Sequence, residues 1–123
     1  MSQGNFSFED LDIWKKAIEF ARIIIGLTEC INAKRKHYRL IEQLESAATS
    51  VALNIAEGSG RYSRKEFIRF LYVARGSLYE TVTLLTIFRQ NHWIAEQQFL
   101  SIKDFSQVIV RMLSGLINSL KKP

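Results

Sequence analysis

The sequence predicts an all-α protein folded as one up-down-up-down antiparallel four-helix bundle. The only proline is the last residue and there are six glycines, so few residues interrupt long helices. Apolar residues recur every three or four positions in four successive segments, which is the spacing of amphipathic helices. Short polar stretches join these segments, and short connections place consecutive helices side by side in opposite directions. A chain of 123 residues is long enough to bury one core without metals or disulfides.

The first helix is expected at about residues 10–32 and the second at about residues 38–58. The first carries two neighbouring apolar stripes at helical spacing, so its apolar face is wide. The basic run between the two helices breaks this pattern and is expected to be a loop. Several alanines lie beside the apolar face of the second helix, and small side chains let a neighbouring helix approach closely.

The third and fourth helices are expected at about residues 63–90 and 95–120. Ser63 and Glu66 have the spacing of a capping box, so the third helix should begin directly after Ser63. Before it, Gly58 and Gly60 are expected to end the second helix with left-handed or unrestrained backbone. The fourth helix shows a heptad of apolar residues that stops before two lysines at the end of the chain.

The third helix carries a second seam of residues well away from its main apolar stripe, and this seam predicts assembly. One bundle cannot cover both seams, so another copy of the chain should pack on the second. Gly76 would allow a close approach there. The seam contains Glu66, Arg69, Val73, Gly76, Glu80, Leu84 and Ile87.

Formal net charge is +5, which suits a nucleic acid or another anionic partner. In an up-down bundle the first and third loops share one end, and the second loop shares the other end with the C-terminus. Both ends are therefore basic. The alternative is that these are ordinary solvated loops. The nucleic-acid-binding candidates are Lys34, Arg35, Lys36 and Arg39 at one end and Arg61, Arg64, Lys65 and Arg69 at the other.

No residue pattern indicates catalysis or metal binding. Asn54, Glu57, Arg75 and Glu80 lie beside apolar seams, where a carboxylate pair could do acid–base chemistry. A buried Glu–Arg and Asn network that sets helix register or a subunit contact explains the same residues, and we favour it. The two histidines and the one cysteine lack metal-ligand spacing. Gly58-Ser-Gly60 lacks the strand and the Lys-Ser or Lys-Thr of a phosphate loop. We expect neither enzyme activity nor a cofactor.

Cysteine content and hydropathy indicate a cytoplasmic protein. Cys30 cannot form an internal disulfide and is expected to be a buried apolar residue of a reduced compartment. No apolar run reaches the ~18 residues of a membrane span. Glu9 and Asp10 stand where a signal peptide would have a basic and then an apolar region. A membrane partner is therefore not expected.

Motifs on both sides of the second turn resemble one bacterial family. They are Asn54-Ile-Ala-Glu-Gly58, Gly60-Arg61, Ser63, Glu66-Phe67, Phe70-Leu71 and Ala74-Arg-Gly-Ser-Leu78 with Glu80, and Phe8-Glu-Asp-Leu-Asp-Ile-Trp14-Lys is similar to the family's first helix. The family is the four-helix-bundle proteins encoded by intervening sequences in 23S ribosomal RNA genes. The sequence differs from it at Ala52, where the family usually has a proline that kinks the helix.

The resemblance implies a homopentameric ring, association with ribosomal RNA or ribosomes, and kinship with the accessory proteins of diversity-generating retroelements. Together with the charge, it predicts a non-enzymatic, RNA-associated homo-oligomer. The alternative is a protein-interaction adaptor that binds a reverse transcriptase. Interface residues expected on the sequence are Asn54, Glu57, Gly58, Val73, Arg75, Gly76, Glu80 and Leu84.

Overall fold

A computed structural model of the protein describes residues 4–31 and 34–123, with the side chains of residues 34–36 excepted. A 3₁₀ helix, η1 (Ser7–Asp10), precedes four α-helices, and the described residues contain no strand. The helices are α1 (Asp12–Glu29), α2 (Lys34–Ser59), α3 (Arg64–Gln90) and α4 (Glu96–Lys121). The predicted all-α class with four helices is confirmed.

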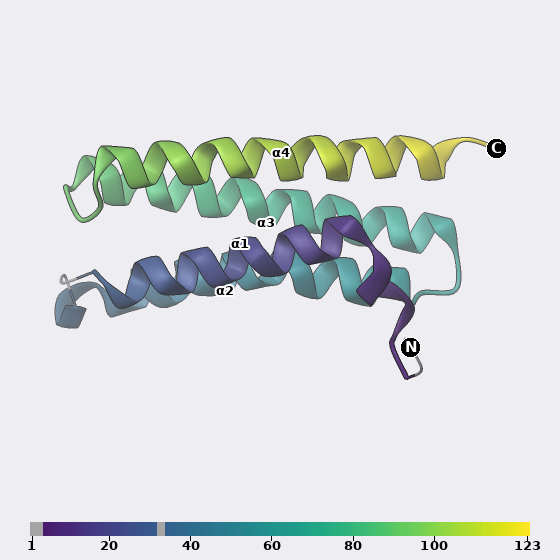
Figure 1. Ribbon diagram of the computed structural model, residues 1–123, viewed down its shortest axis with the longest axis horizontal. Coiled ribbons are helices and arrows are strands. Elements are labelled where there is room, and N and C mark those ends of the chain that lie inside the picture. The colour runs from purple at the N-terminus through teal and green to yellow at the C-terminus, as the bar shows by residue number, and fades with distance from the viewer. Residues whose placement is uncertain (1–3, 32–33) are drawn as a thin grey trace.

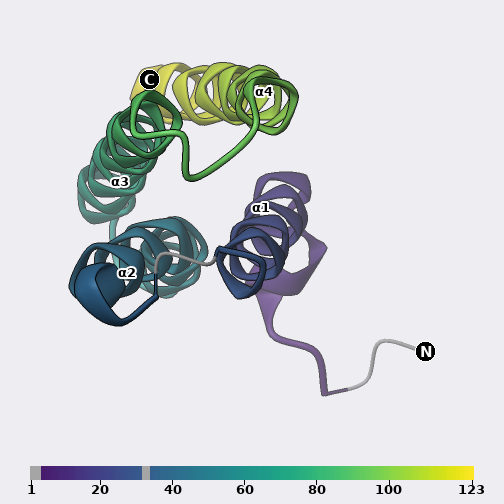
Figure 2. The ribbon, with the colours of Figure 1, turned by 90° about the vertical axis from the view of Figure 1, so that its left-hand side faces the viewer.

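The helices lie along the long axis of the molecule, and successive helices run in opposite directions (Figure 1). The pair α2 and α3 shares the most extensive contact, while α1 and α4 share the smallest contact of any two packed α-helices. Seen from one end, the four helices lie around a common centre, with α4 inclined over α3 and α1 on the side away from α2 (Figure 2). The α3–α4 connection and the start of α2 lie at one end. The α2–α3 turn, η1 and the C-terminus lie at the other end (Figure 1).

All four helices contribute to one apolar core. Its largest fully buried side chains include Phe20 and Ile24 of α1, Leu44 of α2, Phe88 of α3 and Leu113 of α4. These residues recur at helical spacing along each helix, so one face of every helix turns inward. The core leaves the opposite faces of the helices for solvent or partners.

The two ends of the first connection differ from the expected positions. The first helix closes three residues early, because the N–H groups of Cys30 and Ile31 bond to carbonyls only three residues back, at Leu27 and Thr28. Such bonds tighten and end a helix. The second helix begins at Lys34, within the basic run expected to be a loop. Lys and Arg are good helix formers, so the run extends the helix. Helix α2 is continuous through Ala52.

The α2–α3 turn is built differently from the expected glycine turn. Among the described residues, positive φ occurs only at Gly4 and His92, so neither Gly58 nor Gly60 adopts left-handed backbone. Instead, Gly60 N–H and Arg61 N–H bond to carbonyls three residues back and close α2. Gly58 is needed for space, because an added Cβ would lie 2.6 Å from the Cβ of Phe70.

The predicted start of α3 at Ser63 is confirmed. The Ser63 hydroxyl accepts a hydrogen bond from the N–H of Glu66 at 3.2 Å, which satisfies one orphan donor of the first turn. The second hydrogen bond of a capping box would run from the Ser63 backbone N–H to the Glu66 side chain. It is not formed, because the Glu66 carboxylate accepts from Arg69 instead. Local sequence therefore sets where this helix begins, and a charged neighbour determines where the glutamate points.

Candidate nucleic-acid interface

Two of the basic candidates at the α2–α3 end are neutralised by carboxylates. Arg61 Nη2 lies 2.7 Å from Glu57 Oε1, and Arg69 Nη2 lies 3.1 Å from Glu66 Oε1. Both guanidinium groups also lie over the ring of Phe70, at 4.8 and 4.6 Å from its centroid. The hydrogen bond from Arg69 and its charge lower the pKa of Glu66, and the same bond raises the pKa of Arg69. These arginines therefore add little net positive potential at this end.

The other two candidates at this end, Arg64 and Lys65, form no ion pair with a carboxylate among the described residues. Arg64 donates to the backbone carbonyl of Lys122 at 2.8 Å, which ties the start of α3 to the end of α4. A carbonyl has no net charge, so the contact holds the guanidinium in place without neutralising it. Lys65 is exposed. The sequence expected Lys121 and Lys122 at this end, and the contacts of Arg64 show them there.

At the opposite end, the side chains of the candidates Lys34, Arg35 and Lys36 lie outside the part of the chain that the structure describes. Arg39 is exposed on α2. The ring of His37 lies 4.2 Å from that of Trp93, which brings the first turns of α2 beside the α3–α4 connection. Topology therefore brings these segments together as the sequence predicts.

Within the single bundle, the expected network of buried polar residues does not form, because its four members make four separate contacts. Asn54 donates to the Ser50 hydroxyl and carbonyl, and Glu57 binds Arg61. Arg75 donates to Ser114 Oγ at 3.2 Å, and Glu80 accepts from Gln43 at 3.4 Å. Helical spacing points these side chains to different neighbours, so each joins a different pair of turns. Neither a shared acid–base site nor a common register network results.

The second seam of α3 is only partly open to a partner. Val73 is 44% exposed and Ile87 42% exposed, and Gly76 is exposed with open space around it. Leu84 was expected on this surface, but it is 6% exposed and belongs to the core of the single bundle. Leu84 lies at the edge of the seam that is next to the buried stripe of α3. Val73, Gly76, Glu80 and Ile87 are the exposed residues of this face, called here the α3 outer face.

A hydrogen bond that the sequence did not predict joins α3 and α4. Lys121 Nζ donates a hydrogen bond of 2.7 Å to the Tyr72 hydroxyl. This hydrogen bond, and with it the charges of Lys121 and Arg75, lowers the pKa of Tyr72. The Arg75 guanidinium lies over the same ring, 4.9 Å from its centroid. Only tertiary packing reveals this contact, because Tyr72 and Lys121 are far apart in the sequence.

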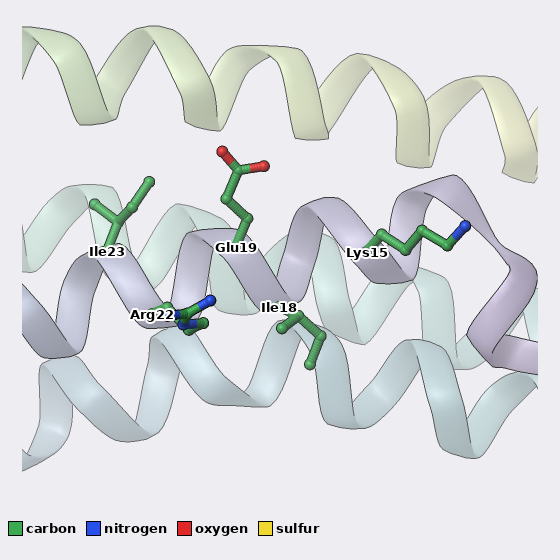
Figure 3. Close-up of a pocket in the computed structure, with 5 residues that line it drawn as sticks. All are labelled: Lys15, Ile18, Glu19, Arg22 and Ile23. Carbon is green, nitrogen blue, oxygen red and sulfur yellow. The ribbon is translucent and has the colours of Figure 1, made fainter.

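A surface depression of about 470 Å³ is lined entirely by residues of α1, and its side chains are not arranged as those of an active site would be. Glu19 and Ile23 point towards α4, whereas Ile18 points the opposite way (Figure 3). A catalytic site needs polar groups that converge on one point, and these diverge.

The structure offers no assembled set of metal ligands and no membrane span in its described part. No group of three or more His, Cys, Asp or Glu side chains is close enough to hold a metal ion within residues 4–31 and 34–123. None of the helices there combines the length and apolar character required to cross a bilayer. Cys30, expected to be buried, is exposed, because α1 ends just before it.

Comparisons with known proteins agree with the motifs around the α2–α3 turn. Residues 9–115 match the profile of the family described as 23S rRNA-intervening sequence protein. A crystal structure of a protein of unknown function from the S23 ribosomal protein family of Bacteroides thetaiotaomicron VPI-5482 is similar, with a TM-score of 0.80 and 28% sequence identity. The similarity covers 85% of this chain and 97% of that one. No curated protein matches the chain significantly.

Proposed function

The chain belongs to the 23S rRNA-intervening sequence protein family, and from this membership we propose that it is a non-enzymatic, cytoplasmic RNA-associated protein. In this proposal its up-down-up-down bundle assembles with further copies into a cyclic oligomer, a pentamer by the resemblance stated above. The RNA is ribosomal RNA or another single strand, and basic residues supply the affinity.

The charge at the end formed by the α2–α3 turn and the C-terminus carries the proposal. Within the described residues, Arg64, Lys65, Lys121 and Lys122 form no ion pair with a carboxylate. Arg64 and Lys121 are held by neutral oxygen atoms of Lys122 and Tyr72. Fixed cations without counter-charges attract phosphates, and each phosphate neutralised on a single strand contributes a salt slope of about 0.7.

Assembly would strengthen such weak contacts. Cyclic symmetry points every subunit in the same direction, so the same basic end of each subunit would lie around one rim of a ring. A strand that touches one subunit then meets the next at a high effective concentration. The α3 outer face would form the contact between subunits, since it presents Val73, Gly76 and Ile87 to solvent.

The test is the affinity for a fluorescein-labelled single-stranded RNA, measured by anisotropy across a range of salt. Wild type should bind with an affinity that falls steeply as salt rises. Changing Lys65 to Gln should weaken binding and lower the slope, because an unpaired cation is lost. Changing Arg61 to Gln is the matched control and should have a smaller effect, because Glu57 already neutralises Arg61. Absence of any salt-sensitive affinity at low ionic strength contradicts the proposal.

An adaptor for a protein partner such as a reverse transcriptase is the second candidate. The observation that favours it is the exposed apolar surface of the α3 outer face at Val73 and Ile87. If the chain is monomeric in solution, this surface is open to a different protein. A complex with a reverse transcriptase that survives high salt, without RNA affinity, would support the adaptor.

A further inference from the structure

A groove runs between α3 and α4 beside the α3 outer face. Its volume is about 290 Å³, and its lining includes Tyr79, Val82 and Thr83 from α3 and Lys103, Gln107 and Val110 from α4. The two helices lie side by side along their length (Figure 1). An open groove of this kind can accept an extended chain.

Two contacts already described lie beyond the groove, towards the C-terminus of α4. Arg75 donates to Ser114, and Lys121 donates to Tyr72. Val110, Ser114 and Lys121 follow one another at helical spacing on α4, as Tyr79, Arg75 and Tyr72 do in reverse on α3. From Lys103 to Lys121 the line spans about 27 Å at 1.5 Å per residue. That length accommodates several nucleotides of an extended strand.

Three cations lie along this line, and their partners are neutral. Arg75 contacts the Ser114 hydroxyl, Lys121 contacts the Tyr72 hydroxyl, and Lys103 lies 5.9 Å from the centroid of the Phe99 ring. None of the three forms an ion pair within the described residues, and the described residues that line the groove include no Asp or Glu. This contrasts with Arg61 and Arg69, whose charges are matched by glutamates.

Two partly exposed tyrosines accompany the cations. Tyr79 is 52% exposed and Tyr72 39% exposed, and they lie two helical turns apart on α3. The hydrogen bond from Lys121 fixes the position of the Tyr72 ring. A row of cations beside aromatic faces is the combination that single-stranded nucleic acid requires, because the cations bind phosphates and the rings stack on bases.

We propose that the α3–α4 groove binds single-stranded RNA, with phosphates on Arg75, Lys103 and Lys121 and a base stacked on Tyr79. This site rests on the proposed RNA association and specifies where the strand lies. The groove borders the α3 outer face, because its lining residue Thr83 lies three positions after Glu80 and four before Ile87. An acidic peptide would satisfy the cations but would not use the tyrosine faces.

The experiment compares wild type with groove variants in anisotropy titrations with a fluorescein-labelled 12-nucleotide single-stranded RNA. Tyr79→Leu removes the ring and keeps an apolar side chain, so affinity should fall about 5- to 100-fold with little change in salt slope. Tyr79→Phe keeps the ring and should bind within about twofold of wild type. Lys103→Gln should weaken binding and reduce the slope by about 0.7. Circular dichroism establishes that each variant is folded.

Four outcomes separate this inference from the proposed function. Strong RNA binding that is unchanged in Tyr79→Leu and Lys103→Gln overturns the groove and leaves RNA association standing. Equal affinity for duplex RNA overturns it too, because a duplex hides the base faces. Binding of a labelled poly-glutamate peptide as tight as that of RNA, and lost in Lys103→Gln, assigns the groove to acidic protein segments instead. Absence of any RNA binding by wild type overturns both proposals.

Discussion

Gly58 lets α2 and α3 approach at their shared end, because a Cβ atom at residue 58 would lie 2.6 Å from the Cβ of Phe70 and 3.0 Å from Cδ1 of Phe67. Cβ atoms are fixed to the backbone, so a clash between two of them cannot be relieved by side-chain rotation. This contact also positions Phe70, whose ring lies beneath both Arg61 and Arg69.

Replacing Gly58 by Ala should therefore destabilise the protein by about 1–3 kcal/mol, the usual cost of overpacking. Chemical denaturation followed by circular dichroism measures the change. Gly115→Ala in α4 is the control, since an added Cβ there meets nothing within 4 Å. Alanine is the better helix former, so the control should be neutral or stabilise by about 0.5–1 kcal/mol. Equal effects of the two substitutions would refute the close approach.

Asn54 and Glu57 should differ in their contributions to stability, although both were expected in one network. Asn54 is half-buried and its amide bonds to two oxygen atoms of Ser50, so Asn54→Ala should cost about 0.5–1.5 kcal/mol. Glu57 forms an exposed pair with Arg61, with 56% of its side chain accessible, so Glu57→Ala should cost about 0.5 kcal/mol or less. A larger loss for Glu57→Ala than for Asn54→Ala in thermal melts contradicts this assignment.

Charge placed on the α3 outer face should dissociate the proposed assembly without unfolding the subunit. Val73→Asp buries an unpaired carboxylate only when subunits associate, so the variant should stay helical and become monomeric. Leu84→Asp should instead unfold the subunit, because Leu84 is in the core. Multi-angle light scattering and circular dichroism distinguish the two results. A monomeric wild type at micromolar concentration would show that the face has no copy of the chain as its partner.

Tyr72 should titrate below the usual range of a tyrosine. Lys121 donates to its hydroxyl and, with Arg75, favours the phenolate, so the pKa is lower in the folded than in the unfolded chain. The resulting stability is fully present above the unfolded pKa and is lost as pH falls through the folded pKa. Wild type should therefore gain stability relative to Tyr72→Phe as pH rises through this alkaline window. An ultraviolet titration of Lys121→Met should show the pKa returning upward; no change would disprove the contact.

Helix periodicity was sufficient to predict the class and the four helices, because burial of one face requires apolar residues every three or four positions. Ser63 was sufficient to predict where α3 begins, since an N-cap depends only on a side chain and the backbone three residues ahead. The two ends of the first connection carry no such local signal and were misplaced. Helix α2 begins within a basic run whose composition is equally compatible with a helix and a solvated loop.

The candidate interface could be predicted only as a list of cations. Whether each cation is available depends on its neighbours. Arg61 and Arg69 have glutamates within one helical turn, but the stacking of both on Phe70 follows from the α2–α3 approach. Leu84 shows the same limit, because helical spacing placed it on an exposed seam and the packing of the bundle placed it in the core.

Local spacing therefore specifies the four helices, their apolar faces and the capped start of α3, since these depend on residues within one or two turns of each other. Packing between α3 and α4 specifies the groove, because Arg75 meets Ser114 and Tyr72 meets Lys121 across 39 and 49 positions of sequence. Contacts over such separations depend on how two helices are placed and rotated against each other. That placement results from the whole core, and no short stretch of sequence contains it.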